Sequence, residues 1–142
     1  MIPLEHEPPP PVYLRPQVAL AVLLAHIVVR RDPKRLRAFL TRVSRAVPPA
    51  TKEEATRARS HVVGASLRCA GPRCLERSVA TALLCRMRGS WPDWCTGVAL
   101  EPFRAHAWVE AEGSGVGEDE RDLMLFTITM RVSSKSPTGA EE

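Results

Sequence analysis

The side chains best able to do covalent chemistry in this chain are four cysteines and four histidines. Among the cysteines, Cys74 follows the helix-breaking pair Gly71-Pro72 and precedes an apolar helical pattern, so it is expected in the first turn of a helix. The free N–H groups and the helix dipole at that position favour a thiolate, and Arg73 and Arg77 add positive charge. The same N–H groups can stabilise a developing oxyanion. Position alone is compatible with two interpretations, a reactive nucleophile and a small buried apolar thiol.

A thiolate nucleophile needs an imidazole that holds its charge and delivers a proton to the leaving group. His106 lies in an alternating segment, residues 105–110, which predicts a strand with His106, Trp108 and Glu110 on one face. The other three histidines fall in the N-terminal segment, in an apolar helix and among helical arginines: His6, His26 and His61. His106 is therefore the candidate general base and acid, although a single histidine is more often structural.

A third group should accept a hydrogen bond from the other imidazole nitrogen. An acidic cluster, Glu118-Asp119-Glu120, follows His106 within one hairpin length, and the segment 113–115 is a plausible turn between them. We expect a short strand at 116–118 beside the histidine strand, although the cluster taken alone would be a solvated turn. A cysteine at a helix start, a histidine on a following strand and an acid on the next resemble the element order of papain-like and transglutaminase-like cysteine enzymes.

The elements that must position these residues change type along the chain, from helices to strands. The patterns predict helices beginning at Pro16, Pro33, Thr51 and near Cys74, followed by strands in 96–100, 105–112 and 125–132. The first helix is apolar nearly all round, which predicts burial in the core. This order indicates an α+β domain with helices packed on an antiparallel sheet. We expect that domain to span residues 13–132, with a disordered proline-rich tail at 1–12 and a disordered tail at 133–142.

Charge is distributed unevenly along the 142 residues. Residues 15–88 hold sixteen Lys and Arg against four Asp and Glu, a net charge of +12, whereas residues 110–142 carry −5. A basic region of this kind is typical of a solvated helix face or of a surface for nucleic acid or an acidic partner. The chain has only seven aromatic residues and no recognised nucleic-acid motif, so we expect no nucleic-acid partner.

Two further classes are disfavoured by the sequence. A structural zinc site is not expected, because the spacings Cys69-x4-Cys74 and Cys85-x9-Cys95 do not match paired metal-binding knuckles. The longest apolar run, residues 18–29, is too short for a transmembrane helix and ends at Arg30-Arg31, and the N-terminus lacks the pattern of a signal peptide. We therefore expect a cytoplasmic protein with free thiols and no membrane partner.

Two blocks carry a more specific resemblance, over about residues 55–130. They are Cys69-Ala-Gly-Pro-Arg-Cys74-Leu-Glu-Arg-Ser78 and Pro102-Phe-Arg-Ala-His106-Ala-Trp-Val-Glu110. At this spacing the chain resembles the lasso peptide biosynthesis B2 proteins, leader peptidases with a transglutaminase-like core.

The resemblance implies a papain/transglutaminase-like cysteine protease that removes the leader from a ribosomally made lasso peptide precursor, without metal or other cofactor. Cys74 would be the nucleophile and His106 the general base and acid. The family has an aspartate twelve residues after the histidine, and this chain has Glu118 there, so we expect Glu118 with Asp119 as the alternate. The alternatives are an acyl-transferring transglutaminase-like enzyme and a non-catalytic basic binding domain.

The resemblance also implies partners. These are the leader region of the precursor peptide, a separate winged-helix protein that recognises the leader, and an ATP-dependent cyclase acting on the released core peptide. The basic region is a hypothetical docking surface for the partner or leader, with Arg57 and Arg59 as residues to test. Phe103 and Trp108 flank the histidine and are candidates for lining the substrate groove.

Overall fold

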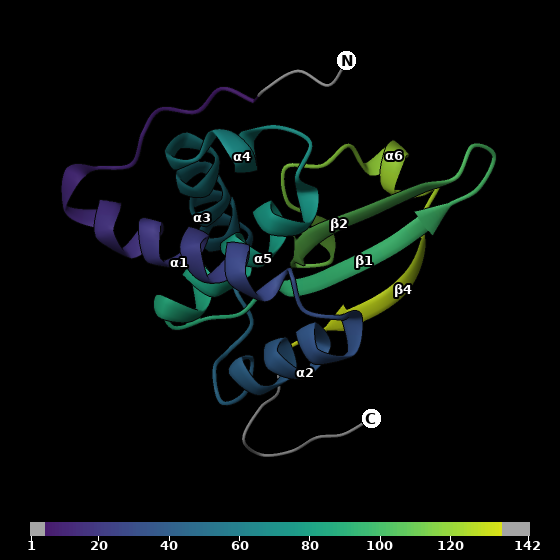
Figure 1. The fold of residues 1–142 in the computed structure, drawn as a ribbon, viewed down its shortest axis with the longest axis horizontal. Coiled ribbons are helices and arrows are strands. Elements are labelled where there is room, and N and C mark those ends of the chain that lie inside the picture. The colour runs from purple at the N-terminus through teal and green to yellow at the C-terminus, as the bar shows by residue number, and fades with distance from the viewer. Residues whose placement is uncertain (1–4, 135–142) are drawn as a thin grey trace.

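A computed structural model describes residues 5–134, which form helices packed on one antiparallel sheet (Figure 1). The elements are η1 (Val12–Leu14), α1 (Arg15–Val28), α2 (Pro33–Val43), α3 (Lys52–Ala65), α4 (Leu67–Ala70), α5 (Cys74–Met87), β1 (Asp93–Ala99), β2 (Arg104–Ala111), β3 (Ser114–Gly115), α6 (Glu120–Leu123) and β4 (Thr127–Val132). No helix among the described residues is long and apolar enough to cross a membrane. The predicted α+β class, with N-terminal helices on a C-terminal antiparallel sheet, is confirmed.

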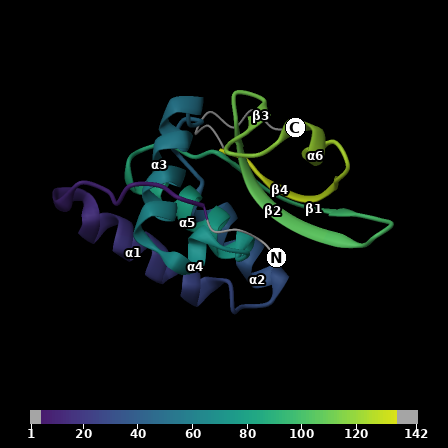
Figure 2. The same cartoon turned by 90° about the horizontal axis from the view of Figure 1, so that it is seen from above.

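The central helix of the fold is α5, which α1, α3 and the sheet surround (Figure 2). Its residues from Glu76 to Cys85 are all buried, so this helix supplies the middle of the core. Helices α2 and α3 begin where the sequence supplies caps: the Asp32 carboxylate accepts the Arg35 N–H, and Thr51 and Glu54 form a reciprocal capping box. Gly89, with φ +99°, ends α5, because that left-handed backbone favours glycine.

The sheet has the strand order β3-β2-β1-β4, with all neighbours antiparallel. β1 and β2 form a hairpin in which Gly97 lies opposite His106. A side chain at Gly97 would collide with the Thr127 carbonyl, so glycine lets β4 approach β1 closely. The sheet therefore holds the histidine strand between β1 on one side and the short β3 on the other.

Three expectations about these elements are wrong in detail. The outer face of α1 is exposed at Leu20, Leu23 and Ile27, because only the opposite face packs on α3 and α5. The predicted continuous helix 51–69 is interrupted at Ser66, whose extended backbone ends α3 and whose hydroxyl accepts the Cys69 N–H to begin α4. The strand expected at 116–118 lies instead at 114–115.

That shift has a local cause. Glu112 and Gly113 both have positive φ, so they form the tight turn, and the strand resumes directly after them. Glu118 consequently lies in the segment that leaves the sheet toward α6 rather than on a paired strand.

The proline-rich N-terminal segment has a defined place along its described part. Residues 5–11 run from the side of α4 along the end of α3 to the start of α1 (Figure 1). Pro10 is buried and its carbonyl accepts a 3.0 Å hydrogen bond from Arg15 Nε. The sequence predicts a disordered tail at residues 1–12, and the described part of that segment makes polar contacts with α4 and α1 and packs on α3. Residues 1–4, and 135–142 of the predicted C-terminal tail, lie outside the described part of the chain.

Candidate active site

Cys74 is the first residue of α5, as the Gly71-Pro72 break predicts. The loop before it is held by Arg77, whose Nη1 donates to the carbonyl oxygens of Cys69 and Gly71 at 3.2 and 2.9 Å. No side chain caps this end of α5, and its first intrahelical bond runs from Arg77 N–H to the Arg73 carbonyl. The preceding N–H groups of the first turn therefore have no acceptor within the helix. They can donate hydrogen bonds to a negatively charged sulfur or to an oxyanion.

The environment of Cys74 favours its thiolate. Burial alone would raise the pKa of this thiol, but hydrogen bonds from His106 and from the Ala107 backbone lower it below the ordinary value. The three other cysteines are buried and have raised pKa values, with Cys85 and Cys95 at about 12 because burial penalises the thiolate. Cys74 is thus the one thiol among the four with the electrostatics of a nucleophile.

His106 lies on β2 between the thiol and a carboxylate. Its Nε2 is 2.8 Å from Glu118 Oε1, which leaves Nδ1 as the ring nitrogen for Cys74. Burial lowers the pKa of His106, but the hydrogen bonds and charges of Cys74 and Glu118 outweigh burial and raise it to about 9. A thiol with a lowered pKa beside an imidazole with a raised pKa favours the thiolate–imidazolium pair at neutral pH.

Two aromatic rings hold the imidazole. Trp108 stacks on His106 with ring centroids 5.6 Å apart and planes 17° from parallel, and Phe126 lies 5.6 Å away at 41°. The alternation of β2 predicts that Trp108 and His106 share a face. Phe126 was not predicted, because it reaches the site from the start of β4 and no local pattern links it to His106. These contacts restrict rotation of the imidazole and keep it directed at the thiol and the acid.

The structure distinguishes the two acids that the sequence left open. Glu118 contacts His106, and its side chain is only 13% exposed. Asp119 caps α6 instead, with Oδ1 accepting the Arg121 N–H at 3.0 Å. The neighbouring Glu120 accepts the Gly115 N–H at 2.8 Å and so fixes the turn that carries Glu118. The Cys74, His106 and Glu118 side chains are therefore brought together, and Asp119 is directed elsewhere.

The remaining candidate residues are not among the described contacts of Cys74 or His106. Phe103 is in the turn between β1 and β2 and is 68% exposed, whereas the rings described against His106 are those of Trp108 and Phe126. His26 Nδ1 pairs with Glu76 at 2.7 Å, and His61 lies 3.0 Å from Arg88. Within residues 5–134, no group of three or more Cys, His, Asp or Glu is placed to hold a metal ion.

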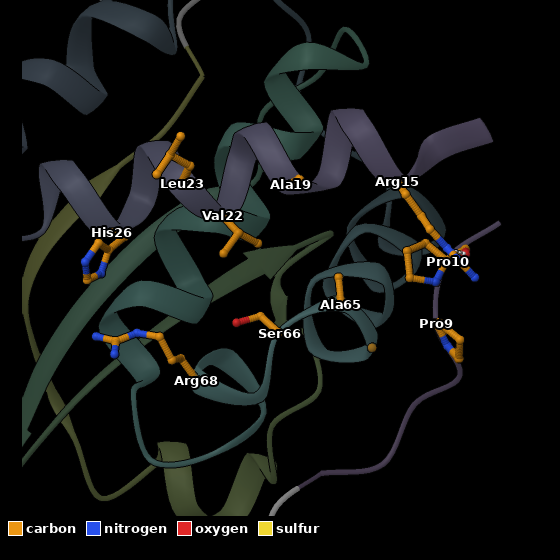
Figure 3. A pocket seen from close by; sticks show the side chains of 11 residues that line it. Pro9, Pro10, Arg15, Ala19, Val22, Leu23, His26, Ala65, Ser66 and Arg68 are labelled. Atoms are coloured by element: carbon orange, nitrogen blue, oxygen red, sulfur yellow. Dashed lines mark hydrogen bonds between the residues drawn. The ribbon is translucent and has the colours of Figure 1, made fainter. Parts of the chain in front are cut away.

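An open, largely apolar groove of about 610 Å³ lies between α1, the end of α3, α4 and the N-terminal segment (Figure 3). Ala19, Val22 and Ala65 line its middle, and His26 and Arg68 lie at one end. Both of these residues contact Glu76, two residues after Cys74. Neither Cys74 nor His106 lines the groove, so it is separate from the reactive thiol.

Comparison with known proteins agrees with this geometry. Residues 18–131 match the family model of the transglutaminase-like superfamily. The comparisons with curated proteins and with solved structures gave no match. The matched region contains Cys74, His106 and Glu118 and covers most of the chain. The chain belongs to the transglutaminase-like superfamily.

Proposed function

We propose that the protein is a cysteine peptidase that removes the leader from a lasso peptide precursor. The observation that carries the proposal is the array in which Cys74 begins a helix, His106 contacts it, and Glu118 holds the other imidazole nitrogen at 2.8 Å. A basic domain without catalysis would not require a thiol of lowered pKa beside an imidazole of raised pKa.

The proposed reaction uses these groups in two steps. The Cys74 thiolate attacks the scissile carbonyl, and the N–H groups at the start of α5 stabilise the oxyanion that forms. The C–N bond then breaks, His106 gives its proton to the departing amine of the core peptide, and the leader remains as a thioester on Cys74. Water, deprotonated by His106, hydrolyses the thioester and releases the leader carboxylate. Glu118 keeps the imidazole oriented and stabilises its positive charge.

The precursor as substrate is supported by the paired sequence blocks around Cys74 and His106, which resemble those of the lasso peptide B2 leader peptidases. That resemblance also implies a separate winged-helix protein that delivers the leader, and a cyclase that acts on the released core peptide. No cofactor enters any of the steps, because each proton and each bond is handled by Cys74, His106 or water.

A docking surface for the partner or the leader is proposed on the basic helical half. Arg59 cannot serve there, because its side chain is only 10% exposed and paired with Glu5, whereas Arg57 is exposed. The exposed face of α2 carries four cationic residues: Lys34, Arg35, Arg37 and Arg42. Charge reversal at Arg37 is expected to weaken partner binding and reduce its salt dependence, and unchanged binding would exclude α2 from the surface.

Membership of the transglutaminase-like superfamily supports a second candidate function, acyl transfer. The same Cys74 thioester would then be attacked by an amine rather than by water, and His106 would accept the amine proton. Incubation with a primary amine distinguishes the two. A peptidase gives a free leader carboxylate with or without the amine, and an acyltransferase gives the leader amide.

The experiment that tests the proposed function mixes the protein with the precursor peptide encoded beside it, with and without the winged-helix partner. Mass spectrometry is expected to show a single cleavage that yields leader and core, faster when the partner is present. The control is the Asp119→Asn protein, which loses one negative charge beside Glu118 but keeps the site, and is expected to cleave normally. An intact precursor under all these conditions would contradict the proposed substrate.

A further inference from the structure

Arg59 of α3 is a buried arginine beside the acid of the site. Its Nη1 and Nη2 atoms donate to the two carboxylate oxygens of Glu5 at 2.8 Å each, a bidentate ion pair. Glu5 Oε2 also lies 3.9 Å from Nη1 of Arg77, the residue that holds the loop before Cys74. The Arg59 and Arg77 side chains are each only 10% exposed, so Glu5 supplies the negative charge that two buried guanidinium groups share.

The position of Glu5 is fixed by the path of the N-terminal segment. The Glu5 N–H donates to the Ala70 carbonyl at 2.9 Å, at the end of α4. Three residues later, the Pro8 carbonyl packs against Gly64 of α3 so closely that a side chain at Gly64 would collide with it. These anchors on α3 and α4 direct the half-buried Glu5 carboxylate at Arg59.

The other side of the Arg59 guanidinium faces the segment that carries Glu118. Gly117 has φ +70°, and a Cβ there would lie 2.6 Å from the guanidinium carbon of Arg59. Burial alone would lower the pKa of Arg59, but the hydrogen bond and charge of Glu5 and the charge of Glu118 raise it. Two carboxylates therefore act on Arg59, those of Glu5 and Glu118. In this structure Arg59 donates its hydrogen bonds to Glu5, and the Oε1 atom of Glu118 is paired with His106.

We propose that Glu5 is a positioning residue, which occupies the Arg59 guanidinium so that the Glu118 carboxylate stays on His106. Without the Glu5 charge, the buried Arg59 guanidinium would lose its ion-pair partner, and Glu118 is the next acid whose charge acts on it. A buried unpaired cation is strongly unfavourable. The Arg59 guanidinium would therefore form an ion pair with Glu118, and the Glu118 carboxylate would lose its hydrogen bond with His106. The role presupposes the His106 chemistry of the proposed function, but it can be measured without any substrate.

The charged groups around the imidazole come from several elements. Cys74 and Arg77 are on α5, Arg59 is on α3, and Glu118 precedes α6. Arg104 of β2 lies over the Phe126 ring, 5.1 Å from its centroid. Substitution at Glu5 changes the bidentate partner of Arg59 and the longer 3.9 Å pairing of Arg77. Because Arg77 is also held by two carbonyl oxygens, the Glu5 effect is expected to pass mainly through Arg59.

The test follows the NMR titration of His106 in the full chain with ring-labelled histidine, assigned by its loss in His106→Asn. Glu5→Gln keeps the shape of the side chain and removes its charge, and is expected to lower the pKa of His106 by about one unit, tenfold in proton affinity. Glu7→Gln is the matched control, because Glu7 is exposed and acts on Arg59 through charge without being among its described hydrogen-bond partners. It is expected to leave the titration unchanged.

Two further variants distinguish positioning from a merely structural role. Glu5→Asp is expected to restore part of the His106 titration, because it returns the negative charge. Glu5→Gln/Arg59→Met removes the competing guanidinium as well and is expected to return the pKa of His106 toward about 9. If Glu5→Gln does not fold, the double variant with a wild-type titration still supports the role.

The proposal is overturned if Glu5→Gln and Glu7→Gln titrate alike, or if the double variant shifts His106 as far as Glu5→Gln does. In the precursor assay, Glu5→Gln is expected to lower kcat about tenfold with KM unchanged, because Glu5 acts through His106. A protein that cleaves no precursor but shows the predicted NMR shifts would contradict the proposed substrate and leave the positioning role supported.

Discussion

Replacing Glu118 by Gln removes the negative charge that faces the imidazole while keeping nearly the same shape. The carboxylate lies 2.8 Å from His106 Nε2, and the two side chains are 13% and 22% exposed, so solvent screens the interaction only partly. The amide oxygen of Gln can still accept a hydrogen bond from the ring. The substitution therefore isolates the charge of the acid from its geometry.

The expected magnitude follows from hydrogen-bond energies. A hydrogen bond to a charged group contributes about 1.5–3 kcal/mol and a neutral one about 1 kcal/mol, so the substitution removes about 0.5–2 kcal/mol. One pKa unit corresponds to about 1.4 kcal/mol. The pKa of His106 is thus expected to fall from about 9 by about one unit. An equal loss in the transition state lowers kcat/KM about tenfold.

The assay measures kcat/KM on the precursor between pH 6 and 10, together with the NMR titration of His106. The ratio of wild-type to Glu118→Gln activity is expected to be larger at pH 8.5 than at pH 6.5, because only the variant has lost much of its imidazolium at the higher pH. Asp119→Asn removes the same charge one residue later, where the carboxylate caps α6. Equal effects of the two substitutions, or an unshifted titration in Glu118→Gln, would refute the role given to Glu118.

The remaining predictions concern pH and the thiols. The activity of the wild-type protein is expected to rise as pH passes the lowered pKa of Cys74 and to fall again near pH 9, where His106 loses its proton; a flat profile from pH 8 to 10 would contradict the ion pair. The pKa of His106 is raised above 6.5 in the folded state. The contribution of protonated His106 to the free energy of unfolding is therefore complete below pH 6.5 and is lost as pH rises through about 9. Urea denaturation should therefore show Glu118→Gln destabilised more at pH 6 than at pH 10, and an equal loss at both would contradict this linkage. Iodoacetamide should alkylate Cys74 alone in the native protein, and modification of the three buried thiols at the same rate would be inconsistent with the structure.

The parts of the site that depend on near neighbours in the chain were predictable. The Gly71-Pro72 break places Cys74 at the start of α5, and the alternation of β2 puts His106 and Trp108 on one face. Both follow from backbone geometry over a few residues, which sequence patterns report directly.

The parts of the site that depend on contacts between distant segments of the chain were not predictable from the sequence. Phe126 reaches His106 because β4 lies beside β1, and Glu5 reaches Arg59 because the N-terminal segment follows α3. Neither sheet order nor the path of an extended segment leaves a periodic signal. The proline run predicts a disordered tail, and composition carries no information about polar contacts such as that of Glu5 with Arg59.

The sequence favoured Glu118 by its spacing from His106 but kept Asp119 as the alternate, so the final choice between them needed the structure. It depends on the turn at Glu112 and Gly113, whose positive φ values set where the strand resumes and which carboxylate faces the imidazole. A turn shifted by one residue would alter the path of the segment and the acid it presents.

The most direct test of a Cys74-dependent peptidase compares Cys74→Ala with Cys69→Ala in the precursor cleavage assay with the partner present. Circular dichroism and thermal unfolding first establish that both variants fold, since each replacement removes only a sulfur atom. Cys74→Ala is expected to give no cleavage, and Cys69→Ala, which alters a buried thiol of raised pKa, is expected to cleave close to the wild-type rate. Cleavage by folded Cys74→Ala at the wild-type rate, or its loss in folded Cys69→Ala, would contradict the assignment of Cys74 as the nucleophile.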